Sequence, residues 1–397
     1  MQGYIYPNEW ELQWSLLIVV YPYLTGLVAG AFILASLARV FNVKAVQPTY
    51  RLSLVTALAF LLAAPLPLMA HLGHPERFYE ILMTPNVRSA MAMFGFVYLW
   101  YLMAVLLLEI WFDFRKDLVV WSEGKAGFLA RLRRGLTLGV KDLSAKALRF
   151  DDRAGKLITI VGIPSAFLLH GYVGFIFGSV KANPWWSSVL MPVVFLFSAI
   201  VSGIALMLLV YVASSALRRQ AVDMACLDKL AAFLLYALMV DFTLEALDFT
   251  QRLYEAEESI HILGQLLSNR LFISLIVLQV SIGTLIPLVT LFFAAPALRG
   301  KGLVPVGERW RKALYVVVAV LIQIGIFSTR WNVVIGGQLF SKSLRGLTVY
   351  KLQFLGIEGI LVAAAILVLP LVLLWLLVKI VPPWHDAEAT IPGTAGD

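Results

Sequence analysis

The side chains that can do chemistry stand at a few points among long apolar runs. The segment HLGHPERF holds His71, His74 and Arg77; an imidazole can exchange a proton near neutral pH, and a guanidinium can meet an anionic partner. His170 and Tyr172 lie inside apolar sequence, where both can hydrogen-bond a polar ligand. HLGHPERF also suits an ordinary helix end with interfacial polar residues, and His170 also suits a plain role in the core.

A second group consists of carboxylates in the segment DFTLEALDF. Asp241, Glu245 and Asp248 are spaced at i, i+4 and i+7, so one helical face carries all three. Three such carboxylates repel one another in a membrane unless some are protonated or paired. The spacing favours a proton path or a polar contact to a ligand. Arg330, at the end of a later apolar run, joins this predicted pathway, although a snorkelling arginine is the alternative.

Glycines line one face of the run that holds His170. Gly171, Gly174 and Gly178 follow one another at spacings of three and four. Such a smooth face permits close helix packing or leaves room for a flat ligand, and the sequence favours neither.

The composition places these residues in a membrane protein. The 397 residues are 60% hydrophobic and 14% charged, whereas soluble domains are about half apolar and a quarter charged. The net charge of +8 fits basic cytoplasmic loops better than nucleic-acid binding. The single Cys226 excludes an internal disulfide and a cysteine-ligated cluster, and one embedded histidine argues against haem between two helices. We therefore expect no metal or haem in this chain.

Nine apolar runs are long enough to cross a bilayer, which needs about 20 residues. Each is predicted to be a helix, because lipid offers backbone groups no other partner. The predicted runs are 15–38, 52–71, 90–111, 157–179, 188–212, 229–250, 271–297, 312–328 and 356–380.

The basic residues predict the orientation. With the N-terminus outside, most of the 32 lysines and arginines fall on the inner side, as cytoplasmic loops require. This predicts an N-out, C-in protein of the cytoplasmic membrane, with HLGHPERF on the outer face. The basic inner segment 113–156 carries apolar residues at helical spacing, which predicts an amphipathic helix on the lipid surface; a solvated loop is the alternative.

Three segments resemble the NrfD/PsrC family, the membrane subunits of polysulfide-reductase-like complexes. HLGHPERF followed by TPNVRSAMAMFG resembles the family's hairpin between its second and third spans. GYVGFIFGSVKANPWWSSVLMPVVFLFSAIVSG resembles its fourth and fifth spans, and RWNVVIGGQ resembles a segment of its longer members. The resemblance covers most of residues 10–360. It departs at His74, where the family has arginine, and near Tyr21, where the family has a histidine.

The resemblance implies two four-helix bundles and a quinone pocket at the outer side of the first. Residues 1–180 would form the first bundle, 181–330 the second, and 331–397 an outer loop, an additional span and a short inner tail. The resemblance maps the family's quinone-contacting tyrosine of the fourth span onto Tyr172. We predict that the quinone site also includes His170, His71, His74, Tyr21 and Arg77. The proton route would comprise Asp241, Glu245, Asp248 and Arg330.

The predicted function is a quinone- or quinol-interacting membrane anchor subunit of a respiratory, sulfur-compound-linked oxidoreductase complex. The resemblance implies menaquinone or ubiquinone as the cofactor and an iron–sulfur subunit on the outer face. It also implies a catalytic subunit of the molybdopterin, hydrogenase or Dsr type. The alternatives are a secondary transporter or proton-conducting subunit, for which buried carboxylates are suited, and an anchor with no redox role.

Overall fold

The structure, a computed structural model, describes residues 12–84, 86–255, 260–295, 304, 306–341, 343–344 and 346–384. In these residues the chain is helical, and its only β pairing is an isolated bridge between Phe340 and Leu347. Nine helices or helix series of the described chain are long and apolar enough to cross a membrane. The predicted all-α integral membrane protein of about nine spans is thus confirmed.

The nine spans are mostly α-helical, with π-helical segments in the third and seventh. The candidate spans are Leu16–Arg39, Lys44–His71, Ala90–Ser122, Ala145–Gly178, Met191–Leu217, Met224–Glu255, Phe272–Ala294, Glu308–Gln338 and Ile360–Ile380. The α-helices are α1 Leu16–Arg39, α2 Tyr50–Ala63, α3 Leu66–His71, α4 Glu80–Met83, α5 Ala90–Leu99, α6 Leu107–Ser122, α7 Phe128–Leu136, α8 Ala145–Gly178, α9 Met191–Leu217, α10 Met224–Glu255, α11 Ile260–Gln265, α12 Ile286–Ala294, α13 Glu308–Val334 and α14 Ile360–Ile380. The π-helical segments are Trp100–Leu106, Leu266–Arg270 and Phe272–Leu285.

Several helices extend beyond the apolar runs that predict them. The helix α8 begins at Ala145 rather than near residue 157, and Ser144 caps it by accepting a hydrogen bond from the Ala147 N–H at 3.3 Å. Arg115 in α6 pairs with Asp151 in α8, which ties the two polar extensions together. The segment 113–156 therefore consists of these extensions and the short α7, whose Phe128 is 79% exposed. The predicted inner tail, 385–397, lies outside the described residues.

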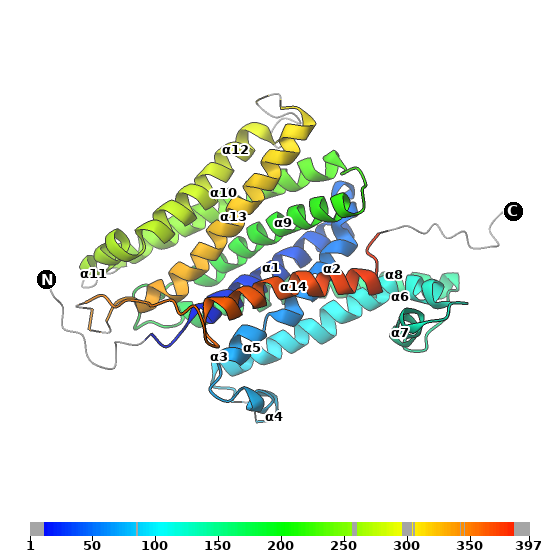
Figure 1. The fold of residues 1–397 in the computed structure, drawn as a ribbon, viewed down its shortest axis with the longest axis horizontal. Helices are drawn as coiled ribbons and strands as arrows, with labels where there is room; N and C mark the ends of the chain where they lie inside the picture. Colours follow the sequence, from blue (N-terminus) through cyan, green and yellow to red (C-terminus); the bar gives the residue numbers. More distant parts are fainter. Residues whose placement is uncertain are drawn as a thin grey trace.

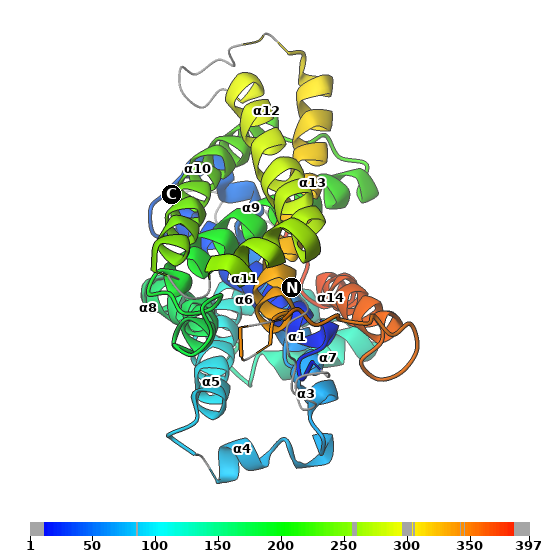
Figure 2. The same ribbon diagram turned by 90° about the vertical axis from the view of Figure 1, so that its left-hand side faces the viewer.

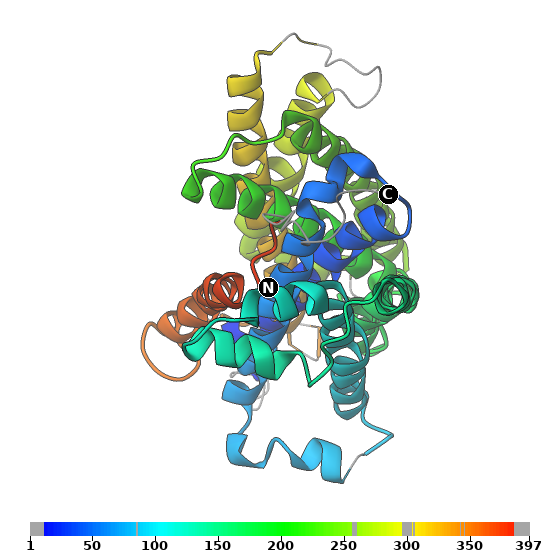
Figure 3. The same cartoon turned by 90° about the vertical axis from the view of Figure 1, so that its right-hand side faces the viewer.

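Two ends of the structure matter for the site. At the end where α1 begins, α3 leads into the segment 72–89, which carries α4 and projects from the body (Figure 2). We call this the hairpin end. At the opposite end α6 leads into α7, and Figure 3 views the structure from this α7 end. The helix α14 runs from the hairpin end, beside α2, toward the α7 end (Figure 1).

The helix α1 lies at the centre of the structure. It packs against α2 and α8 from its own half of the chain and against α9 and α13 from the other half (Figure 1). The helices α9, α10, α12 and α13 also pack against one another. Because α1 contacts both sets of helices, the division into two bundles at residue 180 stays a prediction.

Glycines allow the closest helix approaches. At the crossing of α1 and α9, a Cβ added to Gly30 would overlap the Ala199 carbonyl oxygen and lie 2.8 Å from the Gly203 Cα. On α8, a Cβ at Gly174 would lie 2.7 Å from the carbonyl oxygen of Met191, in α9. The face that carries Gly174 and Gly178 is therefore used for backbone packing, which decides between the two readings left open by the sequence.

Candidate functional site

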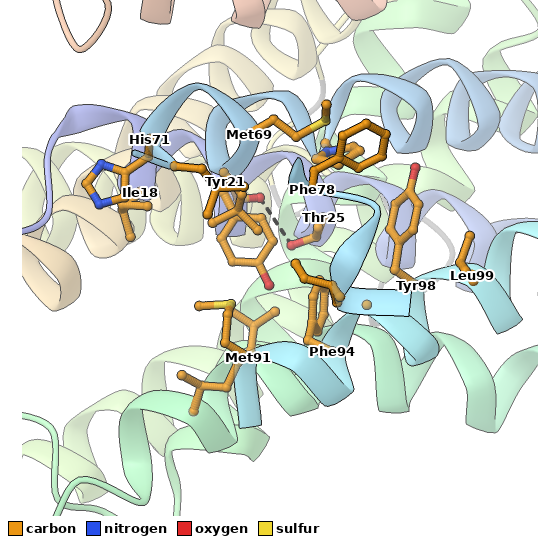
Figure 4. Close-up of a pocket in the computed structure, with 18 of the residues that line it drawn as sticks. Ile18, Tyr21, Thr25, Met69, His71, Phe78, Met91, Phe94, Tyr98 and Leu99 are labelled. Carbon is orange, nitrogen blue, oxygen red and sulfur yellow. Dashed lines mark hydrogen bonds between the residues drawn. The ribbon is translucent and has the colours of Figure 1, made fainter. Parts of the chain in front are cut away.

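A mainly apolar cavity of about 330 Å³ lies near the hairpin end (Figure 4). It is bounded by α1, α3, α5, α8 and the segment that carries α4. Its lining includes the polar side chains of Tyr21, Thr25, His71 and Tyr98 and the apolar side chains of Ile18, Leu68, Met69, Phe78, Met91, Phe94, Val173 and Phe177. A largely apolar pocket with few polar groups is the usual form of a small-molecule site.

The break between α2 and α3 shapes one wall of this cavity. Pro65 has no N–H to continue the hydrogen-bond ladder of α2, which ends at Ala63. The chain restarts as α3, where the Met69 N–H donates to the Pro65 carbonyl at 2.9 Å. Ala64 and Pro65 themselves line the cavity, and α3 carries His71 to its edge.

Tyr21 of α1 supplies a buried phenol to the cavity. The residue is 2% exposed, and its hydroxyl has no hydrogen-bond partner among the described residues. Its ring packs edge-on against Phe94 at 5.4 Å between centroids, and Figure 4 shows it turned toward Met91 and Phe94. A buried hydroxyl normally has a partner, so this atom points to a ligand contact in the cavity.

Tyr172 is not among the described residues that line the cavity. Its ring stacks on Phe94 at 6.1 Å between centroids, and Phe94 faces the cavity. The Phe94 ring is thus shared by Tyr172, which stacks on it, and Tyr21, which meets it edge-on. Through Phe94, Tyr172 can position the wall of the cavity.

The three predicted site residues of HLGHPERF, which are His71, His74 and Arg77, occupy different surroundings. His71 lines the cavity, and its Nδ1 lies 2.7 Å from Glu358 Oε1, just before α14. His74 and Arg77 are exposed on the projecting segment, and neither is among the described lining residues. His74 contacts Glu76 at 3.1 Å, and Arg77 donates to both carboxylate oxygens of Glu80, which lowers the pKa of Glu80.

His170 of α8 is fully buried and connects the cavity to the second half of the chain. Its Nε2 lies 3.2 Å from a guanidinium nitrogen of Arg330, and its Nδ1 lies 3.3 Å from Thr25 Oγ1. A guanidinium can only donate, so Nε2 accepts and the ring proton sits on Nδ1. Thr25 lines the cavity, and its hydroxyl in turn reaches the Tyr21 carbonyl at 3.2 Å.

Arg330 is also fully buried, which excludes the snorkelling arrangement. It donates to Ser198 Oγ at 2.5 Å, and its guanidinium lies 4.2 Å from the centre of the Phe195 ring. It also interacts electrostatically with Asp241 and Glu245 of α10. A buried arginine needs such compensation, because removing a charge from water is costly.

The three predicted carboxylates divide into two groups. Asp248 bonds Ser188 and the arginine one turn further along α10, Arg252, so it is neutralised locally. Asp241 is 3% exposed, and Glu245 accepts a hydrogen bond from Gln279 at 3.0 Å. Of the three carboxylates, Asp241 and Glu245 are the two that interact electrostatically with Arg330.

Three members of the network were not predicted from the sequence. Thr25 gave no signal, because threonines in membrane helices usually bond their own backbone. Gln279 and Asn332 hydrogen-bond each other at 2.7 Å, and Asn332 also accepts from Ser274 at 2.5 Å. Gln279 stands alone in the apolar run IVLQV, a signal that could have found it, whereas Asn332 lies in the polar segment STRWN.

A family model described as "Polysulphide reductase, NrfD" matches residues 7–342. The match includes every cavity-lining residue and the whole His170–Arg330 network. The chain belongs to this NrfD family. In this NrfD-family protein, α14 lies beyond the matched residues, as does Glu358, the partner of His71.

Three curated relatives each match about half of this NrfD-family chain. A selenate reductase subunit of Mesobacillus selenatarsenatis is 39% identical over 50% of this chain and 47% of its own length. A Halobacterium salinarum protein, provisionally named as a dimethyl sulfoxide reductase membrane subunit, is 32% identical over 50% of this chain and 42% of its own. Protein NrfD of Escherichia coli is 30% identical over 50% and 59%. The chain thus spans about half the length of these relatives.

Proposed function

We propose that this chain is the quinone- or quinol-interacting membrane anchor subunit of a respiratory oxidoreductase complex in the cytoplasmic membrane. The observation that carries the proposal is the unpartnered, buried Tyr21 hydroxyl in an apolar cavity. The family match and the names of two relatives, both reductase subunits, support it. The two reductases are named for different substrates, selenate and dimethyl sulfoxide, so the proposal concerns the membrane subunit's role and not one substrate.

The cavity fits the chemistry of a quinone. A quinone ring is flat and apolar apart from two carbonyl oxygens, and it carries an apolar tail. The cavity offers a mainly apolar lining with the Tyr21 hydroxyl as a donor and His71 as a second polar group at its edge. Tyr21 would donate to one carbonyl oxygen, while Phe94 would face the ring.

A bound quinone supplies two-electron, two-proton redox chemistry. His71 can hold or release a proton at the cavity edge, and Glu358 orients it through Nδ1. Thr25 links the cavity to His170, and His170 links to Arg330. We propose Arg330, Asp241 and Glu245 as a route along which protons leave or enter, with Asp248 at its hairpin-end margin.

The hairpin end is the proposed docking side for an iron–sulfur subunit, which would connect to a catalytic subunit. On the projecting segment Phe78, Tyr79 and Met83 expose apolar side chains beside the charged Arg77 and Glu80. This end is the outer face in the predicted N-out orientation. Co-purification of these subunits with the chain tests the partner, and a co-purified transporter substrate instead would contradict it.

Tyr21→Phe is expected to lower quinone-linked turnover of the complex by about 5-fold, because one charge-neutral hydrogen bond is worth about 1 kcal/mol and is lost at the ligand. Bound quinone in the purified complex should fall as well. Tyr172→Phe should have a smaller effect, since Tyr172 stacks on Phe94 and is not among the described lining residues. Tyr254→Phe, on a residue that is 87% exposed, is the matched control. Turnover equal to that of the control would rule out Tyr21 as the contact.

The second candidate is a proton-conducting subunit without a redox role. The buried Arg330 and Asp241 and the half-buried Glu245 favour it, because ionisable groups inside spans mark proton relays. Proteoliposomes that hold the chain alone distinguish the two. Proton flux without quinone supports the second candidate, and bound quinone with no flux supports the first.

A further inference from the structure

A second row of buried polar groups runs from the cavity toward the α7 end, apart from the His170–Arg330 network. Its members stand on α2 and on the series formed by α5, the π-helical segment Trp100–Leu106 and α6; α2 packs against the π-helical segment and α6. Each of its four members has a buried polar atom with no hydrogen-bond partner among the described residues: the Tyr101 hydroxyl, Thr56 Oγ1, Ser53 Oγ and Glu109 Oε2.

Glu109 is the ionisable member of this row. It is fully buried, and its Oε1 accepts hydrogen bonds from Thr159 at 2.7 Å and from Tyr50 at 3.4 Å. The second oxygen receives none from the described residues. A carboxylate in this position is costly unless it is protonated or bonded to water, so the site is built for a carboxyl group that can carry a proton.

The order of the row along the two helices gives it a direction. Tyr98 and Leu99 line the cavity, and Tyr101 follows them directly toward the α7 end. Tyr101 interacts electrostatically with Glu109 across the π-helical segment. On α2, Thr56, Ser53 and Tyr50 follow one another in the same direction, toward the α7 end. The Tyr50 hydroxyl donates to Glu109.

The row reaches solvent at the α7 end through charged groups. Asp113, one turn beyond Glu109, pairs with Arg51 at 2.8 Å and with Arg39 of α1 at 3.3 Å. The Arg51 side chain is 12% exposed and lines a polar surface cleft of about 280 Å³. The groups around Glu109 are thus Tyr50, Thr159, Tyr101 and this Arg–Asp cluster.

The π-helical segment lies where the row passes from the cavity to Glu109. Its Tyr101 and Val105 are fully buried, and Tyr101 packs edge-on against Phe32 of α1 at 5.6 Å. Wide turns of this kind recur at functional sites in helices. An internal water chain needs buried polar groups with free hydrogen-bond capacity, and the members of this row have such capacity.

We propose that Glu109 is the proton-carrying group of a route between the solvent at the α7 end and the cavity. In each proton transfer the Glu109 O–H bond breaks and the proton moves toward Tyr101. The carboxylate then takes a proton from the side of Arg51 and Asp113. Glu109 returns to its starting state, and two such transfers match the two electrons that the partner's redox centre exchanges at the cavity. The use of these protons at the cavity rests on the proposed function; the route itself does not.

Infrared spectroscopy of the whole complex in lipid tests the route without quinone. The carboxylic-acid C=O band that disappears in Glu109→Gln belongs to Glu109. We expect this band in the unmodified complex to shift within minutes in D₂O, and Thr56→Val to slow the shift by about 10-fold. Absence of any such band, or a band that does not exchange, overturns the proposal. If Glu109→Gln fails to assemble, Glu109→Asp identifies the band by its change in frequency.

Proton uptake in proteoliposomes tests the use of the route. Glu109→Gln is expected to lower proton uptake from the α7 side and quinone-linked turnover together, by about 10-fold or more. Glu123→Gln, an exposed glutamate at the end of α6, is the matched control. Turnover that stays unchanged in Glu109→Gln contradicts the route, whereas an unmodified complex with no quinone-linked turnover contradicts the proposed function and leaves the exchange result standing.

Discussion

Gly30→Leu is expected to prevent stable assembly of the protein. The added Cβ would overlap the Ala199 carbonyl oxygen and press on the Gly203 Cα at 2.8 Å, so the clash is with the backbone of α9 and no rotamer relieves it. Separating α1 from α9 would also open the centre of the structure, since α1 contacts both halves of the chain. Overpacking by side chains alone costs about 1–3 kcal/mol, and we expect at least about 3 kcal/mol here.

The yield of folded protein in membranes and its thermal unfolding in detergent measure this effect. Gly30→Ala should give an intermediate loss, because its single methyl group meets the same carbonyl oxygen. Gly264→Leu is the control, since a Cβ at Gly264 has nothing within 4 Å. A Gly30→Leu protein that unfolds at the temperature of this control would show that α1 and α9 do not cross as described.

The sequence was sufficient for the number of spans and insufficient for their ends. Apolar runs indicate where lipid must be, and backbone hydrogen bonding then requires a helix. The ends depend on contacts between distant residues, which hydropathy does not contain. Arg115 and Asp151 illustrate this, because their ion pair allows α6 and α8 to continue past the apolar region. Ion pairs of this kind join residues whose separation in sequence gives no clue to their contact.

For the site too, the sequence indicates candidate residues but not which residues they contact. His170, Arg330 and Asp241 stand out in apolar sequence, so their importance is predictable from the energetic cost of placing an ionisable group in a membrane span. Spacing put Asp248 in the same group as Asp241, although Arg252 four residues later neutralises it. The sequence predicts both Tyr21 and Tyr172 as contacts, but only packing distinguishes the phenol that lines the cavity from the one that stacks on Phe94.

Arg330→Met is expected to have the largest effect on the buried network. It leaves His170 Nε2 and Ser198 without their donor and leaves Asp241 and Glu245 without a nearby cation. Removing one partner of a buried charge cluster costs about 3–5 kcal/mol, because the remaining charge is uncompensated. We therefore expect a lower unfolding temperature and loss of quinone-linked turnover. Arg270→Met, on an exposed arginine, should change neither.

A second substitution separates the two causes of this loss. If the uncompensated carboxylate is what destabilises Arg330→Met, then adding Asp241→Asn should restore much of the unfolding temperature, since the change removes that charge. Turnover should not return, because the proposed proton route then lacks both groups. Arg330→Lys should keep the charge but supply fewer fixed donors to His170 and Ser198, and should fall between the two. If the change in unfolding temperature of the double variant equals the sum of the changes in the two single variants, Arg330 and Asp241 are not coupled.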